Sequence, residues 1–369
     1  MLSPPLSFSD LPGWAQDDHR PALAAFLRHC GGEAASRGGE PAVRLGVSAQ
    51  ALRRACQAGE IAAKEGSGEA ARRFFETAFE PRRVLAEGFV TGYFEPEYPG
   101  ALHRDALYAT PLLRRPENLV ALDDANRPEH LPSSAPFALR GPDGALALPP
   151  DRGEIMDGAL SGRGLELVWL ADPVDAFYVH VQGSARIRLK EGGVMRVGYA
   201  GKTGHPYSPI GRVMIERGLA EPGTVTMDVL RGWLARNPEE IDGVLRRNRS
   251  YIFFRQVSEA GPDEGPVGAA GLPLVAGRSL AVDAAFHAYG TPVFVSADLP
   301  AGDGRSETPF RRLMVAEDTG SAIVGPARGD LFAGSGDHAG ELAGGVNAVA
   351  SFVLLLPRGS VSHAPGGDD

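Results

Sequence analysis

The segment AEDTGSAIVGPARGD, residues 316–330, carries two aspartates, Asp318 and Asp330, on either side of a turn that contains glycine. Apolar residues lie beside each of them, with LMVA at 313–316 and LF at 331–332. A carboxyl group with apolar neighbours and a second carboxylate nearby ionises less readily than one in water. The segment therefore favours acid catalysis, in which a side chain holds a proton and then donates it. The alternative for either aspartate alone is a turn residue that hydrogen-bonds nearby backbone.

The letters DTGS in this segment also occur in aspartic peptidases. Such an enzyme needs two carboxylates that share one proton, each presented by a similar loop. This chain has a single Asp-Thr-Gly, at 318–320, and Glu317 stands where a buried peptidase loop favours an apolar residue. A homodimer could supply the second loop, but its subunits would be far shorter than this chain. The peptidase hypothesis is therefore the weakest of those that the segment allows.

The composition indicates a globular chain with many turns. The 48 glycines and 30 prolines among 369 residues favour short strands over long helices. The formal net charge is −9 and the basic residues are scattered, which argues against a nucleic-acid partner. Nine dispersed histidines and two cysteines, Cys30 and Cys56, do not support a metal site. A disulfide between the cysteines and two separate thiols both stay open.

The apolar spacing divides the chain into three sections. Helices are expected before residue 80, with Ser48 as an N-cap, at 20–30, 48–64 and 69–79. The middle section predicts strands at 89–94, 165–170, 176–182 and 185–189, a loop at 199–207, and short helices after Thr226 and Asn237. Asp337-His338 is expected to be loop. The last section predicts a small barrel from strands at 251–254, 279–282, 292–295, 313–316 and 349–356.

Several motifs in order along the chain resemble one known family. The C-terminal set is Asp283, the run EDTGSAIVG at 317–325 and DLF at 330–332, which resembles the "3D" domain. Upstream are TGYFEP at 91–96, VQGSA at 181–185, VGYAGK at 197–202, HPYSPIG at 205–211 and NRSYIFF at 248–254. In this order they resemble the membrane-bound lytic transglycosylase A family of peptidoglycan-cleaving enzymes, over roughly residues 10–357. Phe94 and Ser321 depart from the usual tyrosine and glycine.

The resemblance implies a mainly β fold with peripheral helices. A double-psi β-barrel domain, with a helical N-terminal lead-in, would comprise residues 1–105 and 250–357 and contain the three aspartates. A smaller β-domain with short helices, residues 106–249, would be inserted into it. The glycan strand would lie in the groove between the two domains, and residues 358–369 would be a disordered tail.

The resemblance also assigns a reaction. Asp330 would protonate the leaving oxygen of the β-1,4 bond between N-acetylmuramic acid and N-acetylglucosamine. It would then accept the proton of the muramic C6 hydroxyl, which attacks C1 and gives a 1,6-anhydro product. The family pattern places Asp318 beside it in the catalytic site and places Thr91, Tyr93, Gln182, Lys202 and Asp283 in substrate binding. No cofactor or metal is expected.

Alternatives remain for the activity and for individual residues. The chain could be a lysozyme-like hydrolase, a non-catalytic peptidoglycan-binding protein or, least favoured, a peptidase. Tyr93 and Tyr199 could stack on sugar faces, although strand aromatics are as often core residues. Lys202 could meet a muramyl carboxylate or a peptide, or could simply be solvated. Asp283 is better explained as a residue that closes a turn than as a catalytic one.

The family implies a place in the cell envelope. We expect a periplasmic protein, associated with the outer membrane in its native form, and partners in cell-wall synthesis or remodelling. This chain shows neither a signal peptide nor a lipobox cysteine near its start. Membrane anchoring is accordingly expected only in a longer native form.

Overall fold

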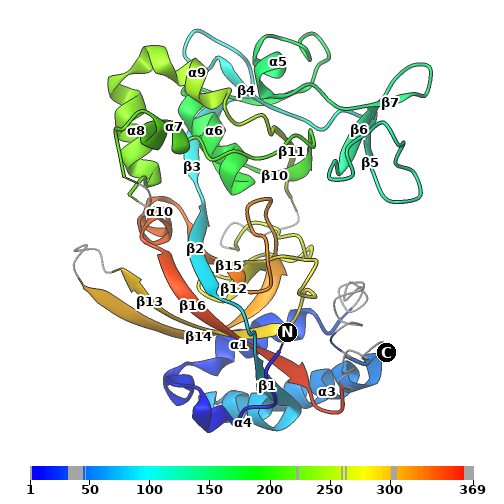
Figure 1. Cartoon of the computed structure of the whole chain (residues 1–369), viewed down its shortest axis with the longest axis vertical. Coiled ribbons are helices and arrows are strands. Elements are labelled where there is room, and N and C mark those ends of the chain that lie inside the picture. Colours follow the sequence, from blue (N-terminus) through cyan, green and yellow to red (C-terminus); the bar gives the residue numbers. More distant parts are fainter. Residues whose placement is uncertain are drawn as a thin grey trace. The chain divides into compact units, whose positions relative to one another are not determined.

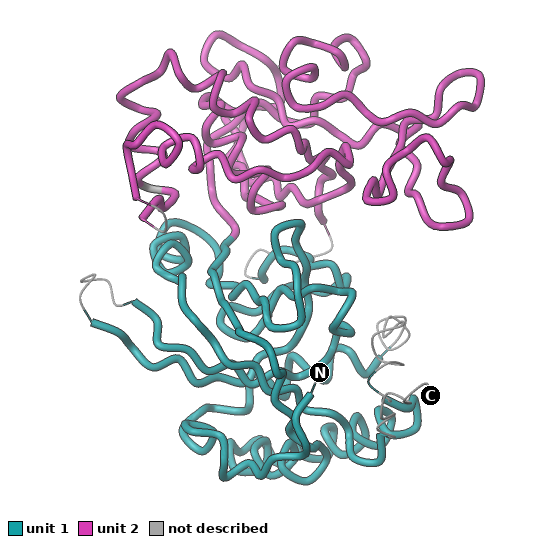
Figure 2. The backbone as a smooth tube through the Cα atoms, in the orientation of Figure 1, with its two compact units in different colours: residues 1–94, 260–369 teal, residues 95–259 magenta. Residues whose placement is uncertain are grey.

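The computed structural model describes residues 2–31, 45, 47–221, 224–258, 261, 264–300 and 306–360 of the chain. They form two compact units, shown in Figure 2. Unit 1 is Met1–Phe94 with Ala260–Asp369, and unit 2 is Glu95–Glu259. The sequence-based domain limits were placed at 105 and 250, whereas these units divide after Phe94 and after Glu259. None of the helices in the described ranges is long and apolar enough to cross a bilayer.

Unit 1 is built on a sheet that closes on itself (Figure 1). The strands follow the order β1-β16-β13-β14-β12-β15-β2, and β16 also pairs with β2. All of these strands except β1 therefore form a closed ring. Their bounds are β1 Phe79–Arg83, β2 Gly88–Glu95, β12 Ser279–Val282, β13 Pro292–Pro300, β14 Glu307–Asp318, β15 Arg328–Ser335 and β16 Asn347–Pro357.

The continuous apolar runs in these strands are explained by burial on both faces. Side chains alternate between the faces of a strand. In β13, Val293 and Val295 pack with the cluster inside the ring, whereas Phe294 packs with the cluster under the helices. In β16, Phe352 and Leu354 likewise face inward while their neighbours face the helices. The ring strands therefore bury apolar side chains on both faces: one set fills the interior of the ring, and the other packs against the helices.

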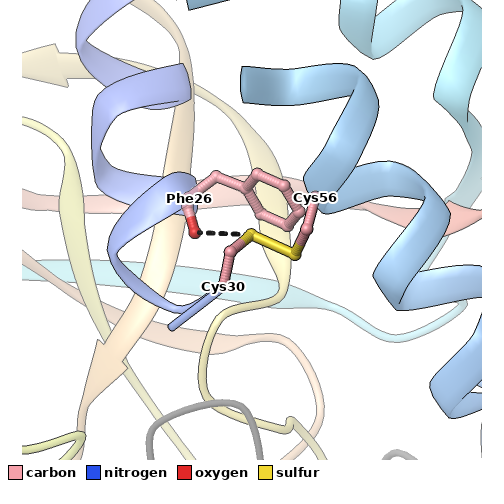
Figure 3. The surroundings of a disulfide bond; sticks show 3 residues. All are labelled: Phe26, Cys30 and Cys56. Atoms are coloured by element: carbon pink, nitrogen blue, oxygen red, sulfur yellow. Dashed lines mark hydrogen bonds between the residues drawn. A yellow bond between two sulfur atoms is a disulfide. The ribbon is translucent and has the colours of Figure 1, made fainter. Parts of the chain in front are cut away.

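Helices α1 His19–Arg28, α3 Ala49–Glu65 and α4 Gly68–Ala78 cover one face of this sheet (Figure 1). Each begins at a side-chain cap, with Ser48 accepting from the Ala51 N–H at 3.1 Å as predicted. Cys30, just after α1, forms a disulfide with Cys56 of α3, with their Cα atoms 5.6 Å apart (Figure 3). The disulfide alternative is therefore the one that the structure shows. A short helix, α10 Asp337–Gly344, lies between β15 and β16.

Unit 2 contains a sheet of order β11-β10-β9-β3-β8-β4, a small sheet of order β5-β6-β7, and helices. The first comprises β3 Glu97–Ala101, β4 Thr110–Leu113, β8 Glu166–Leu170, β9 Ser184–Leu189, β10 Val194–Lys202 and β11 Ile252–Gln256. The second comprises β5 Leu119–Ala121, β6 Phe137–Arg140 and β7 Leu146–Ala147. The helices are α5 Arg152–Met156, α6 Pro173–Gln182, α7 Arg212–Glu216, α8 Met227–Arg236 and α9 Ile241–Leu245.

Three local predictions were wrong. Residues 176–182 form the end of helix α6, not a strand. This helix is buried against the sheet through Val179 and against other helices through Phe177, so it lacks the one-sided pattern of a surface helix. Residues 199–202 of the expected loop belong to β10, and Asp337-His338 begin α10 instead of lying in a loop. The expected disordered tail falls largely outside the described residues.

Candidate active site

In unit 1, two aspartates lie on the two sides of one short strand. Ala281 of β12 pairs with Asp318 of β14 in parallel and with Asp330 of β15 in antiparallel. Directly paired residues point to the same face of a sheet. Leu280, Val282 and Leu331 fill the interior of the ring, so the two carboxyl groups lie on the opposite face. The sheet itself thus brings together the two acids that the sequence singled out.

A register shift in β14 separates the neighbouring acids Glu317 and Asp318. Leu280 pairs with Ala316 and Ala281 pairs with Asp318, so Glu317 is the extra residue of a bulge. Its fully buried carboxylate accepts from Arg28 Nη2 at 2.6 Å, lies 2.9 Å from His29 Nε2, and also accepts from the Ser279 hydroxyl. Glu317 is therefore tied to the end of α1 and is not part of the acid pair.

Asp330 is held by a short chain of hydrogen bonds. The Thr91 hydroxyl donates to Asp330 Oδ1 at 2.7 Å and accepts from Arg328 Nη2 at 2.6 Å. Burial raises the pKa of Asp330 to about 6, with the bond from Thr91 and the charge of Arg328 opposing the rise and Asp318 adding to it. A carboxyl group with this pKa can both donate and accept a proton near neutral pH.

Asp318 has partners of its own. The Tyr93 hydroxyl donates to Oδ2 at 2.9 Å, and the Ala269 N–H donates to Oδ1 at 2.9 Å. Burial raises the pKa of Asp318, although these bonds work against the rise. The Tyr93 ring packs on Phe332 with a centroid distance of 5.3 Å. The side chain of Tyr93 is thus held in place both by the hydrogen bond from its hydroxyl to Asp318 and by the packing of its ring.

Strand β2 presents Thr91 and Tyr93 together because residues two apart share a face. Gly92 between them faces α10. A Cβ at this position would lie 2.6 Å from the carbonyl oxygen of Ala343 and 2.7 Å from its Cα atom. The absence of a side chain at Gly92 lets β2 approach the helix closely and explains the Thr-Gly-Tyr order.

Asp283 accepts hydrogen bonds from the backbone and, among the described residues, forms none with Asp318 or Asp330. One carboxylate oxygen accepts from the Ala285 N–H at 3.0 Å and the other from the Gly325 N–H at 2.7 Å. It therefore links the turn after β12 to the loop between Asp318 and Asp330. These bonds favour the turn-closing role over direct contact with substrate.

The other candidate residues belong to unit 2. Gln182 ends α6, and its side-chain nitrogen lies 3.6 Å from the sulfur of Met227. Lys202 ends β10, where burial lowers the pKa of its ammonium group. Tyr199, in the same strand, is 45% exposed. These three residues are not in the unit that carries the two aspartates.

The geometry differs from a peptidase dyad. No hydrogen bond joins the carboxyl groups of Asp318 and Asp330 among the described residues; each instead accepts from its own partners in β2. A shared proton between the two acids, as a peptidase needs, has no support here. In the described ranges, no group of three or more His, Cys, Asp or Glu side chains is placed to hold a metal ion.

Two contributors to this site were missed by the sequence analysis. Arg328 precedes Asp330 by two positions in β15, and the alternation of a strand would have placed both on one face. Ala269 belongs to a loop that is distant in sequence from Asp318, and only its backbone N–H is used. No sequence pattern identifies a backbone donor of that kind.

Comparison with known proteins agrees with the motif order. The sequence model of the MltA specific insert domain matches residues 89–255, and that of the 3D domain matches residues 278–356. The membrane-bound lytic murein transglycosylase A of Vibrio cholerae is 37% identical over 219 residues, 58% of each chain. The match thus spans little more than half the length of that curated relative.

Solved structures extend the likeness to nearly the whole chain. A membrane-bound lytic murein transglycosylase from Agrobacterium tumefaciens is 46% identical with a TM-score of 0.83, covering 96% of this chain and 97% of that one. MltA of Escherichia coli, solved with bound chitohexaose, is 25% identical with a TM-score of 0.66, covering 91% and 89%. The chain therefore belongs to the membrane-bound lytic murein transglycosylase A family.

Proposed function

We propose that this chain is a peptidoglycan lytic transglycosylase that cleaves the β-1,4 bond between N-acetylmuramic acid and N-acetylglucosamine. Family membership supports the reaction class. Chitohexaose, bound in the solved E. coli relative, has the same β-1,4-linked sugar backbone as peptidoglycan. The observation that carries the proposal is Asp330, a carboxyl group with a pKa near 6 and a hydroxyl donor fixed on one oxygen.

In this mechanism Asp330 acts as acid and then as base. Its protonated form donates the proton to the glycosidic oxygen as the bond to C1 breaks. The resulting carboxylate accepts the proton of the muramic C6 hydroxyl while that oxygen bonds to C1 of the same ring. Asp330 thereby regains the proton that it donated, and no water is consumed. An internal nucleophile replaces the second carboxylate that retaining glycosidases use.

Asp318 assists through charge in this proposal. An ionised Asp318 disfavours the ionisation of Asp330 and stabilises positive charge that develops on the sugar ring. Tyr93 and the Ala269 N–H keep its carboxylate in place. Thr91 orients Asp330, while Gln182 and Lys202 of unit 2 are proposed to bind the glycan strand. Asp283 is proposed to act on substrate only indirectly, through the loop that it fixes.

Two further parts of the family pattern are proposed here. The closed ring of unit 1 is proposed to be of the double-psi type, and unit 2 is proposed to be the inserted domain. In the cell the protein acts on peptidoglycan in the periplasm, attached to the outer membrane in its native form. The names of the relatives, which call them membrane-bound, support that location.

Product analysis on purified sacculi tests the proposed reaction. The wild-type chain should release 1,6-anhydromuramyl products, which mass spectrometry separates from hydrolysis products by the mass of one water. Asp330→Asn should lower turnover by about a thousandfold, because it removes the proton that acid catalysis needs. Circular dichroism should show that this variant remains folded.

The alternatives give different results in the same assay. Reducing-end products would identify a hydrolase. Sacculus binding without any product would identify a non-catalytic peptidoglycan-binding protein. Full activity in Asp330→Asn would remove this residue from the mechanism even if anhydro products form. Asp124→Asn, which alters an exposed acid of unit 2, serves as the matched control.

A further inference from the structure

Unit 2 contains a feature of its own that is suited to binding. It is a hollow of about 660 Å³. Its lining comprises Arg114, Arg115, Phe137, Leu167, Tyr199, Ala200, Phe254, Arg255 and Gln256, and is called here the arginine hollow. Sites for small ligands typically measure about 300–1,000 Å³. The hollow is therefore large enough for a short peptide.

The arginine hollow is basic in a chain of net charge −9. Three arginines line it, and none of its described lining residues is acidic. In the described part of the chain, no carboxylate lies within ion-pair distance of Arg114 or Arg115. Guanidinium groups bind carboxylates through paired N–H donors in a fixed geometry. A ligand with free carboxylates is thus the chemistry that this surface fits.

Arg115 is held in a defined position. Its guanidinium donates to the carbonyl oxygen of Leu119 at 2.7 Å and to that of Ala200 at 3.3 Å, and it lies over the Phe137 ring at 5.4 Å. A charge fixed before binding loses less conformational entropy when a ligand arrives. Tyr199, 45% exposed, adds an apolar surface beside it. The arginine hollow thus offers positive charges, which suit the carboxylates of a peptide, beside an aromatic surface, which suits its aliphatic side chains.

We propose that the arginine hollow binds the anionic peptide stem of peptidoglycan. Such stems carry free carboxylates on their acidic residues and at their C-termini, along with short aliphatic side chains. This inference rests on the proposed function, since it takes peptidoglycan as the substrate. It assigns the stem to unit 2 and leaves bond cleavage to Asp330 of unit 1.

Charge reversal at Arg114 tests the stem site. This side chain is exposed, so Arg114→Glu should leave the fold intact. Arg236→Glu makes the same charge change on an exposed arginine of α8 outside the hollow and is the control. The substrates are sacculi with their stems and the same sacculi stripped of stems by an amidase. Arg114→Glu should lower kcat/KM about tenfold on the first, the loss expected for one exposed charge-assisted contact, and leave the second unchanged.

A binding measurement decides the proposal independently of cleavage. The full chain is titrated with free stem tetrapeptide in a calorimeter at low salt. Wild type and Arg236→Glu should bind alike, and Arg114→Glu should bind about tenfold more weakly. Absence of wild-type binding, or equal binding by Arg114→Glu, overturns the stem site. Binding without anhydro products from sacculi would instead overturn the proposed function and leave the stem site standing.

Anionic vesicles complete the test, because phosphate headgroups would also attract arginines. Vesicles containing phosphatidylglycerol should bind wild type and Arg114→Glu equally. If Arg114→Glu loses vesicle binding but keeps tetrapeptide binding, the hollow is a lipid site and the stem proposal is wrong.

Discussion

Asp318 and Asp330 are both strand neighbours of Ala281, one from each side. Adjacent strands lie about 4.8 Å apart, so the backbones of the two acids are separated by roughly 10 Å. With this spacing, the strand pairing by itself does not bring the two carboxyl groups close enough to share a proton. It still lets the charge of Asp318 raise the pKa of Asp330. The arrangement is compatible with the proposed roles, in which Asp330 donates the proton and Asp318 supplies a fixed charge.

The pH dependence of cleavage should follow the protonation of Asp330. Because the proposed reaction starts from the acid form of Asp330, kcat/KM should fall as the pH rises above the pKa of about 6. The decline should approach tenfold per pH unit, so the value at pH 8 should be about a hundredfold below its maximum. Initial rates on soluble glycan strands between pH 5 and pH 8.5 measure this. A flat profile over that range would contradict the role of Asp330 as acid.

Two substitutions should shift the falling limb of the pH profile, the range in which kcat/KM declines as the pH rises, in opposite directions. Thr91→Val removes a hydrogen bond that favours the ionised form of Asp330, so its pKa should rise and the limb should shift to higher pH. Asp318→Asn removes a negative charge that disfavours ionisation, so the pKa of Asp330 should fall and the limb should shift to lower pH. The pH profiles of kcat/KM report both shifts.

The control for this pair is Thr91→Ser, which keeps the hydroxyl and should keep the wild-type limb. Arg328→Gln should act in the same direction as Thr91→Val, because the guanidinium both donates to Thr91 and lowers the pKa of Asp330 by charge. Shifts of equal sign in Thr91→Val and Asp318→Asn would show that the site does not tune Asp330 through these groups.

Asp330→Asn should stabilise the protein at neutral pH while it lowers turnover. Folding raises the pKa of Asp330 from 3.8 to about 6, so the folded state binds its proton more tightly than the unfolded state. The stability that this group contributes is therefore full below pH 4 and is lost as the pH rises through 6. Asparagine stays neutral throughout, and should add about 1–3 kcal/mol to the unfolding free energy at pH 7.

Urea denaturation at pH 7 and pH 4 measures this difference. The gain should be present at pH 7 and absent at pH 4, where the aspartate is itself neutral. Asp124→Asn, on an exposed acid, is the comparison at both pH values. A loss of stability in Asp330→Asn at pH 7 would mean that the ionised carboxylate is favoured by the fold, contrary to its raised pKa.

The success of the fold prediction depended on how each segment is buried. Strands such as β13 and β16 have continuous apolar runs because both faces are covered. The expected strand at 349–356 nearly matches β16, whereas the one at 292–295 covers only the first part of β13. Helix α6 is also covered on opposite sides, and the same kind of run was therefore taken for a strand. The Asp172-Pro173 start of this helix, with the N-cap bond from the Val174 N–H at 2.7 Å, was the available signal.

The site was predictable only where its residues lie in motifs. Asp318 and Asp330 stand out by sequence, but the position of β12 between them was not predicted. The bulge at Glu317 and the bonds from Arg28 and His29 depend on how α1 packs against β14, which no local pattern reports. The disulfide was left undecided for the same reason, since it needs two helices to be placed side by side.

The Cys30–Cys56 disulfide should contribute measurable stability to unit 1. It closes a loop across 26 positions and joins the end of α1 to α3 next to Phe26, a fully buried core residue (Figure 3). A cross-link of this span restricts the unfolded chain, and its loss in Cys30→Ser/Cys56→Ser should cost about 3 kcal/mol. Thermal unfolding with and without dithiothreitol measures the effect: the reductant should lower the Tm of wild type and leave that of the double variant unchanged. Equal Tm values for oxidised wild type and the double variant would show that packing around Phe26 alone holds these helices together.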